Sequence, residues 1–112
     1  MNGGAQLSVT DLRGSARCPV HYTTVGEHLA LGEIELHICN VSTTGFMVDS
    51  CTIMERGHRM IVRLPTVGRI EGCCVWTHEG RAGFQFERII RPDDYATMIS
   101  AMQPKARLRQ PA

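Results

Sequence analysis

The sequence predicts an all-β fold, a six-stranded antiparallel β-barrel followed by one C-terminal α-helix. Six short runs of strand-forming residues lie between residues 18 and 86, and turn residues separate them at short intervals. After Ile90 the period of the apolar residues changes from that of a strand to that of a helix. The chain has 112 residues, 43% hydrophobic and 21% charged, which suits a single soluble domain with one core.

Three strands are expected in the first half of the chain, at residues 18–24, 33–38 and 46–48. The first is rich in β-branched and aromatic side chains, and Pro19 lies near its start, where a strand tolerates proline. The second alternates polar and apolar side chains, the period of a strand with one buried face. Residues 26–32 are expected to connect these two strands. Residues 40–45 are expected to form the turn that precedes the third.

Three further strands are expected in the second half, at residues 58–64, 70–77 and 82–86. In the first of them, Met60, Val62 and Leu64 share one face, and Arg59, Ile61 and Arg63 share the other. These two arginines are expected to be solvated or paired with a carboxylate. Turn residues at 65–68 and 79–80 separate the strands. Trp76, the only tryptophan, is expected in the core rather than as a stacking platform.

A helix is expected after Ile90, because four apolar residues recur at helical spacing: Tyr95, Met98, Ile99 and Met102. Pro92 suits the first turn, and Asp93 and Asp94 favour the positive end of the helix dipole. Pro104 ends the helix. We expect the helix to cover an open end of the barrel.

The expected organisation is a flexible N-terminal arm at residues 1–11, one domain at residues 12–102 and a disordered basic tail at residues 103–112. The formal net charge is only +1, so no global field indicates DNA, RNA or an anionic membrane as a partner. No apolar stretch approaches the length of a membrane span, and the first residues lack the features of a secretory signal. We therefore expect a cytoplasmic protein that does not insert into membranes.

Five cysteines occur, an odd number without a C-x-x-C pair: Cys18, Cys39, Cys51, Cys73 and Cys74. They are expected to be reduced and mostly buried. A zinc site is the alternative, since His37 and Cys39 can share one face of a strand, but further ligands at the usual spacings are lacking. We expect neither a metal nor another cofactor.

Arg13 and Arg17 flank a small Gly-Ser-Ala spacer just before the first expected strand. Their guanidinium groups are planar forks suited to phosphate and guanine. The same spacing recurs at Arg59 and Arg63 inside an expected strand, so the spacing alone carries little weight. What distinguishes the first pair is its place on a flexible segment beside the barrel. A solvated arm without a ligand remains the alternative for this pair.

A second motif, Asn-x-Ser-x-x-Gly, lies on the expected turn at residues 40–45. The Asn40 amide carries an acceptor and donors together, so it can pair with a polar base edge. Ser42 can donate to a phosphate oxygen or a base. Gly45 would let backbone and ligand approach closely. A plain β-turn, which favours the same residue types, is the alternative.

Taken in order, these motifs resemble those of the PilZ domain, the bacterial receptor module for cyclic di-GMP. The resemblance covers about residues 12–102, nearly the whole chain. The features that carry it are the two arginines followed directly by Cys-Pro-Val, the Asn-x-Ser-x-x-Gly motif, the strand-like residues 57–64 and 75–76, and Gly-Phe-Gln-Phe at residues 83–86. Asparagine in place of aspartate at the first position of the second motif is an accepted variant.

The resemblance implies a six-stranded antiparallel barrel with a C-terminal helix, and a ligand that is often bound as a stacked, intercalated dimer. It implies that Arg13 and Arg17 contact phosphates and the Hoogsteen edges of guanine. Asn40 and Ser42 would hold a guanine from the opposite side, and Gly45 would make room for the ligand. Cyclic di-GMP is thus the expected ligand.

We therefore expect a cyclic di-GMP effector without enzymatic activity, because the histidines form no arguable catalytic set. The arm would fold over the ligand and change the surface seen by an unidentified downstream protein of the motility, exopolysaccharide or transcription machinery. One alternative is an interaction adaptor on the same fold that binds no nucleotide. Another is a small RNA- or single-strand-binding barrel, which the 5% aromatic content disfavours.

Overall fold

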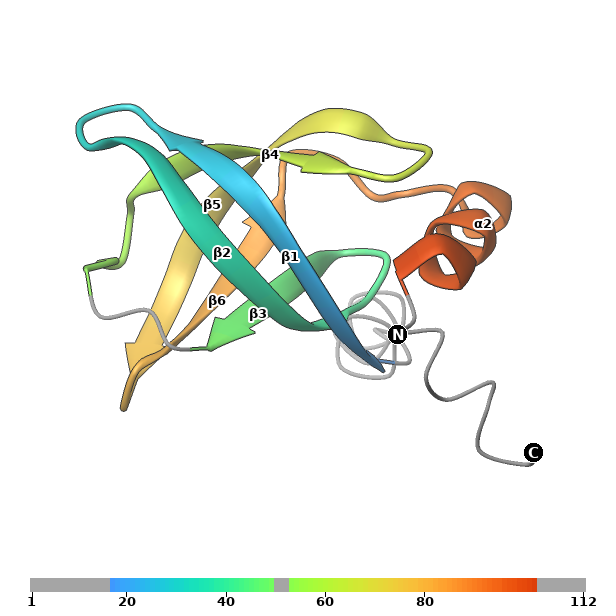
Figure 1. The fold of residues 1–112 in the computed structure, drawn as a ribbon, viewed down its shortest axis with the longest axis horizontal. Helices are drawn as coiled ribbons and strands as arrows, with labels where there is room; N and C mark the ends of the chain where they lie inside the picture. The colour runs from blue at the N-terminus through green and yellow to red at the C-terminus, as the bar shows by residue number, and fades with distance from the viewer. Residues whose placement is uncertain (1–16, 50–52, 103–112) are drawn as a thin grey trace, which may run out of the picture.

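Six antiparallel strands form a closed barrel in the computed structural model, which describes residues 17–49 and 53–102 (Figure 1). The strands are β1 (Cys18–His28), β2 (Gly32–Val41), β3 (Gly45–Asp49), β4 (Arg59–Leu64), β5 (Gly68–His78) and β6 (Arg81–Phe86). Around the barrel they follow the order β1-β2-β3-β6-β5-β4. The predicted all-β barrel is confirmed. The expected arm, the expected basic tail and Arg13 lie outside the described residues.

The core of the barrel is built from the inward-facing side chains of its strands. Successive side chains of a strand point to opposite faces, so about every second residue faces inward. Phe46 and Val48 of β3 are buried in this way, as are Met60 and Val62 of β4. Phe46 stacks on Phe84 of β6 with the ring centroids 4.8 Å apart. This packing determines which residues of the same strands are left on the outer surface.

β1 is longer than predicted, because it continues to His28 and only residues 29–31 connect it to β2. The prediction of a connection at residues 26–32 was therefore wrong at its start. Gly26 lies inside the strand and pairs with both Ile34 of β2 and Val62 of β4. A Cβ on Gly26 would come closer than 3.0 Å to the side chain of Met60. The glycine is needed for close packing inside the barrel rather than for a turn.

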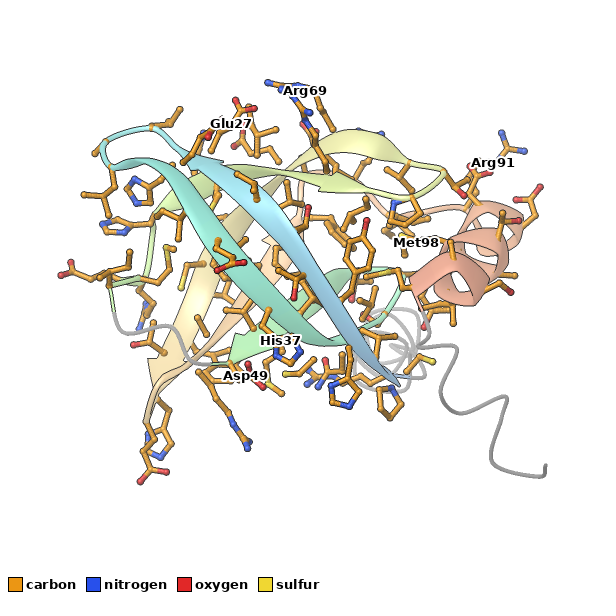
Figure 2. All side chains as sticks on the ribbon, viewed as in Figure 1. Glu27, His37, Asp49, Arg69, Arg91 and Met98 are labelled. Carbon is orange, nitrogen blue, oxygen red and sulfur yellow. The ribbon has the colours of Figure 1, made fainter. Side chains whose placement is uncertain are left out.

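The helix α2 (Pro92–Met102) follows β6 and lies at one end of the barrel, close to the start of β1 (Figure 1). Met98 and Met102 are buried, and Figure 2 shows Met98 on the side of the helix that faces the barrel. The Tyr95 hydroxyl donates to the carbonyl oxygen of Val41 at the end of β2, at 3.0 Å. The predicted helix and its apolar face are confirmed. No helix in the described ranges is both long and apolar enough to span a bilayer.

Candidate functional site

A pocket of about 260 Å³ opens on the outside of the barrel over β2, β3, β6 and β5. Four of the five residues predicted to bind the ligand line it: Arg17, Asn40, Ser42 and Gly45. The fifth, Arg13, lies outside the described residues. Arg17 immediately precedes β1, and the other three come from the end of β2 and the turn into β3. The fold thus brings the two sequence motifs together, while their role in binding stays a prediction.

The strand register sets a row of four residues across the floor of this pocket. Asn40 pairs with Met47, Met47 pairs with Gly83, and Gly83 pairs with Trp76. The next row points into the core and consists of Val41, Phe46, Phe84 and Cys74. Because neighbouring rows point to opposite faces, the row from Asn40 to Trp76 faces outward.

Two β-bulges turn the ends of this row outward. Ile38 is buried, so regular alternation would point Asn40 inward as well, but β2 has one more residue than β3 between these two positions. In the same way, Cys74 is buried and β5 has one more residue than β6 between Cys74 and Trp76. An extra residue shifts the alternation by one and re-aims the side chains that follow it. The two bulges therefore turn the Asn40 amide and the Trp76 indole towards the pocket.

Trp76 lines the pocket, although the sequence predicts it in the core. Its half-buried side chain lines the pocket on the outer face of the sheet, so the core prediction was wrong. The error follows from the bulge at Val75, which alternation counted along β5 does not reveal. Gln85 and Thr44 also line the pocket and had no predicted role. Thr44 lies within the Asn-x-Ser-x-x-Gly motif and Gln85 within the Gly-Phe-Gln-Phe segment at residues 83–86, and these positions were the only available signal.

Hydrogen bonds hold the turn between β2 and β3 in place. The backbone N–H of Ser42 donates to the carbonyl oxygen of Gly45 at 2.8 Å. The N–H of Phe86 donates to the carbonyl oxygen of Thr44 at 2.9 Å. The turn is therefore closed on itself and attached to the end of β6. Its polar side chains are presented to the pocket from a fixed backbone.

The Ser42 hydroxyl has a structural role within this turn. It accepts the backbone N–H of Thr44 at 3.2 Å and lies 3.0 Å from the Thr44 hydroxyl. Ser42 is only 6% exposed. Since one of the two hydroxyls donates to the other, the second keeps a proton that it can donate to a ligand. The pair therefore offers one hydroxyl donor at the pocket wall.

Gly45 is closely packed against β6. A Cβ at this position would come closer than 3.0 Å to the carbonyl oxygen of Phe84 and would lie 3.3 Å from Cα of Gln85. The φ angle of Gly45 is not in the left-handed region, so the turn does not require glycine for its conformation. The motif predicts that this glycine makes room for a ligand. In the structure, the backbone of β6 is what occupies the space next to it.

The charge around the pocket suits an anion. Arg17 is exposed at its rim, and none of the described residues that line it is acidic. Beyond Gln85 lies a second hollow of about 290 Å³ whose lining includes Arg59, Glu71 and Glu87. There the arginine is already paired, with Nη1 of Arg59 3.6 Å from Oε2 of Glu71. Of these two hollows, the first is the one that can accept a phosphate without carboxylate repulsion.

The second arginine pair is exposed on the outer surface, and each of its arginines lies near a carboxylate, as predicted. Arg63 lies 4.0 Å from a carboxylate oxygen of Glu27, and Arg59 is paired with Glu71. Arg69 makes two hydrogen bonds to Glu27, at 2.7 and 3.1 Å (Figure 2). The hydrogen bond from Arg69 lowers the pKa of Glu27, and the positive charges of Arg69 and Arg63 add to this effect.

His37 of β2 pairs with Asp49 of β3, and Nδ1 of His37 lies within hydrogen-bonding distance of Oδ1 of Asp49, at 2.6 Å (Figure 2). The Cys39 thiol donates a hydrogen bond to the carbonyl oxygen of Met47, at 3.5 Å. Burial raises the pKa of the Cys39 thiol and the charge of Asp49 raises it further, so the thiol stays protonated near neutral pH. Within residues 17–49 and 53–102, no group of three or more His, Cys, Asp or Glu side chains could hold a metal, so the zinc alternative gains no support.

The cysteines are less buried than predicted. Among the four in the described ranges, Cys74 is buried, whereas three are partly exposed: Cys18, Cys39 and Cys73. Cys73 pairs with the exposed residues Arg59 and Gln85 and so lies on the outer face of β5, whereas Cys18, at the start of β1, packs against the core. The prediction of mostly buried cysteines was therefore wrong for this part of the chain.

The chain matches no known protein-family model, and no curated protein sequence matches it. The described lining combines one guanidinium group, two amides, a hydroxyl pair and an indole. Such a set can bind a flat, anionic ligand that carries polar edges. It contains no nucleophile paired with a general base.

Proposed function

We propose that this protein is a PilZ-type receptor that binds cyclic di-GMP and signals to a partner protein. The observation that carries the proposal is the convergence of Arg17, Asn40, Ser42 and Trp76 on one pocket without an acidic residue in its described lining. An arginine fork fits both a phosphate and the O6/N7 edge of guanine. The Asn40 amide can pair with a base edge, and the Trp76 indole offers a flat apolar surface on which a base can stack.

The size of the pocket indicates how such a ligand would sit. At about 260 Å³ it is smaller than the roughly 300–1,000 Å³ typical of sites that enclose a small molecule. A cyclic dinucleotide would place one base and its phosphate in the pocket, and the remainder would lie on the surface. The segment that carries Arg13 would then cover the exposed part of the ligand. Ordering of this segment would alter the surface available to a partner.

The direct test is calorimetric titration with cyclic di-GMP. A bidentate arginine contact to guanine is worth about 1–3 kcal/mol, so Arg17→Ala should weaken binding by about 5- to 150-fold. Asn40→Ala should weaken it as well, and Arg13→Ala should resemble Arg17→Ala. Arg63→Ala is the matched control, because Arg63 belongs to a pair with the same spacing but is not part of the pocket lining. The affinity of Arg63→Ala for cyclic di-GMP should equal that of the unmodified protein.

The choice of nucleotide tests the guanine contact separately. Cyclic di-AMP has the same phosphodiester ring but lacks the O6 acceptor of guanine, so it should bind more weakly by a similar factor. If the unmodified protein binds no cyclic di-GMP, or if Arg13→Ala and Arg17→Ala both bind it undiminished, the proposal is refuted. The interaction adaptor that binds no nucleotide would then be the better hypothesis.

A further inference from the structure

The indole of Trp76 lies directly on Gly83, its cross-strand partner on β6. A Cβ on Gly83 would lie 2.5 Å from Cε2 and 2.9 Å from Cδ1 of the indole, and closer still to Nε1. Gly83 is buried although it belongs to the outward-facing row, which is explained by the indole that covers it. The backbone of Gly83 is not in the left-handed region, so conformation is not the reason for a glycine here.

We propose that Gly83 is a positioning residue whose missing side chain forms the slot that holds the Trp76 indole against the sheet. The inference deepens the proposed function, and its ligand-binding consequence rests on that function. Two features act in sequence: the bulge at Val75 turns residue 76 outward, and the slot then lets the indole lie over Gly83 of β6. With the slot filled, the ring must lift off β6 into the space of the pocket.

The slot is specific to the indole. The three atoms nearest to the Cβ of an alanine at position 83 all belong to the Trp76 ring. At Gly72 of β5, by contrast, the nearest atom would be Cε1 of Phe46, at 3.0 Å in the core. Gly72→Ala therefore adds the same methyl group to the same sheet without touching Trp76. It is the matched control for Gly83→Ala.

The position of the ring can be measured without any ligand, because Trp76 is the only tryptophan of the chain. In Gly83→Ala we expect a red-shifted emission maximum and a larger acrylamide quenching constant, since the ring leaves its slot for solvent. Gly72→Ala should show neither change. Emission and quenching of Gly83→Ala equal to those of the unmodified protein would overturn the inference, whether or not the proposed ligand binds.

Affinity for cyclic di-GMP provides the second readout. Base stacking on an aromatic residue corresponds to about 5- to 150-fold in affinity, so Trp76→Ala and Gly83→Ala should each lose binding within this range. If Gly83 acts through the indole, Gly83→Ala adds no further loss in the Trp76→Ala background. An equal loss in both backgrounds would contradict a positioning role.

Folding of the variants gives a third outcome. If Gly83→Ala fails to fold, the double variant Gly83→Ala/Trp76→Ala should fold, because removal of the indole removes the clash. Circular dichroism and thermal unfolding measure this directly. A double variant that also fails to fold would show that the glycine accommodates something other than Trp76, and the inference would be wrong.

Discussion

Replacement of Gly45 by alanine separates two explanations for the glycine of the second motif. The structure places the added Cβ against the backbone of β6, closer than 3.0 Å to the carbonyl oxygen of Phe84 and 3.1 Å from its carbonyl carbon. Backbone atoms cannot rotate away as a side chain can. The clash is relieved only if β3 and β6 move apart at the pair between Gly45 and Gln85. We therefore expect Gly45→Ala to lower the stability of the barrel itself.

The expected magnitude follows from the cost of overpacking. Extra carbon atoms in a well-packed site cost about 1–3 kcal/mol. In a domain of this size, each kcal/mol lowers the melting temperature by about 4–8 °C. Gly45→Ala should therefore lower the melting temperature by roughly 4–24 °C, before any ligand is added.

Thermal unfolding followed by circular dichroism provides the assay. Gln85→Ala is the control, because it changes the same cross-strand pair at an exposed side chain and should alter stability by no more than about 0.5 kcal/mol. Titration with cyclic di-GMP well below the melting temperature then measures affinity separately. A Gly45→Ala variant that melts like the unmodified protein but no longer binds the nucleotide would refute the packing argument. The glycine would then be required by the ligand.

Two further predictions concern single contacts. Tyr95→Phe removes the hydrogen bond from α2 to the Val41 carbonyl. It should lower the free energy of unfolding by about 1 kcal/mol, and hence the melting temperature by about 4–8 °C. An unchanged melting temperature would contradict this. Since burial raises the pKa of Tyr95, the unmodified protein should also lose stability as the pH rises through that pKa, and Tyr95→Phe should lose less. Arg69 lowers the pKa of Glu27 in the folded protein. The pair therefore stabilises the fold when the pH is above about 4.3, the pKa of a glutamate in the unfolded chain. This stabilisation is lost as the pH falls through the folded pKa. The difference in melting temperature between the unmodified protein and Glu27→Gln should therefore shrink on acidification, and a difference that stays constant would contradict this.

The parts of the fold that depend on local pattern could be predicted from the sequence. The helix was recognised because Met98 and Met102 recur at helical spacing, and burial of that same face is what attaches α2 to the barrel. Arg59 and Arg63 were placed on the outer face because alternation along β4 is regular. The end of β1 was misplaced because Gly26, which resembles a turn residue, is needed where β1 meets both β2 and β4.

The candidate site also has parts that local sequence predicts and parts that depend on strand pairing. The motif residues are local features, and their identity and order were readable from the chain alone, as were the six strands that carry them. That Asn40 and Trp76 face the pocket depends on bulges, and a bulge exists only as a difference in residue count between two paired strands. Counted along its own strand, each of these side chains belongs inside the barrel. Pairing with β3 and with β6 turns them outward, and this is why the pocket could be recognised only once the strands were assembled.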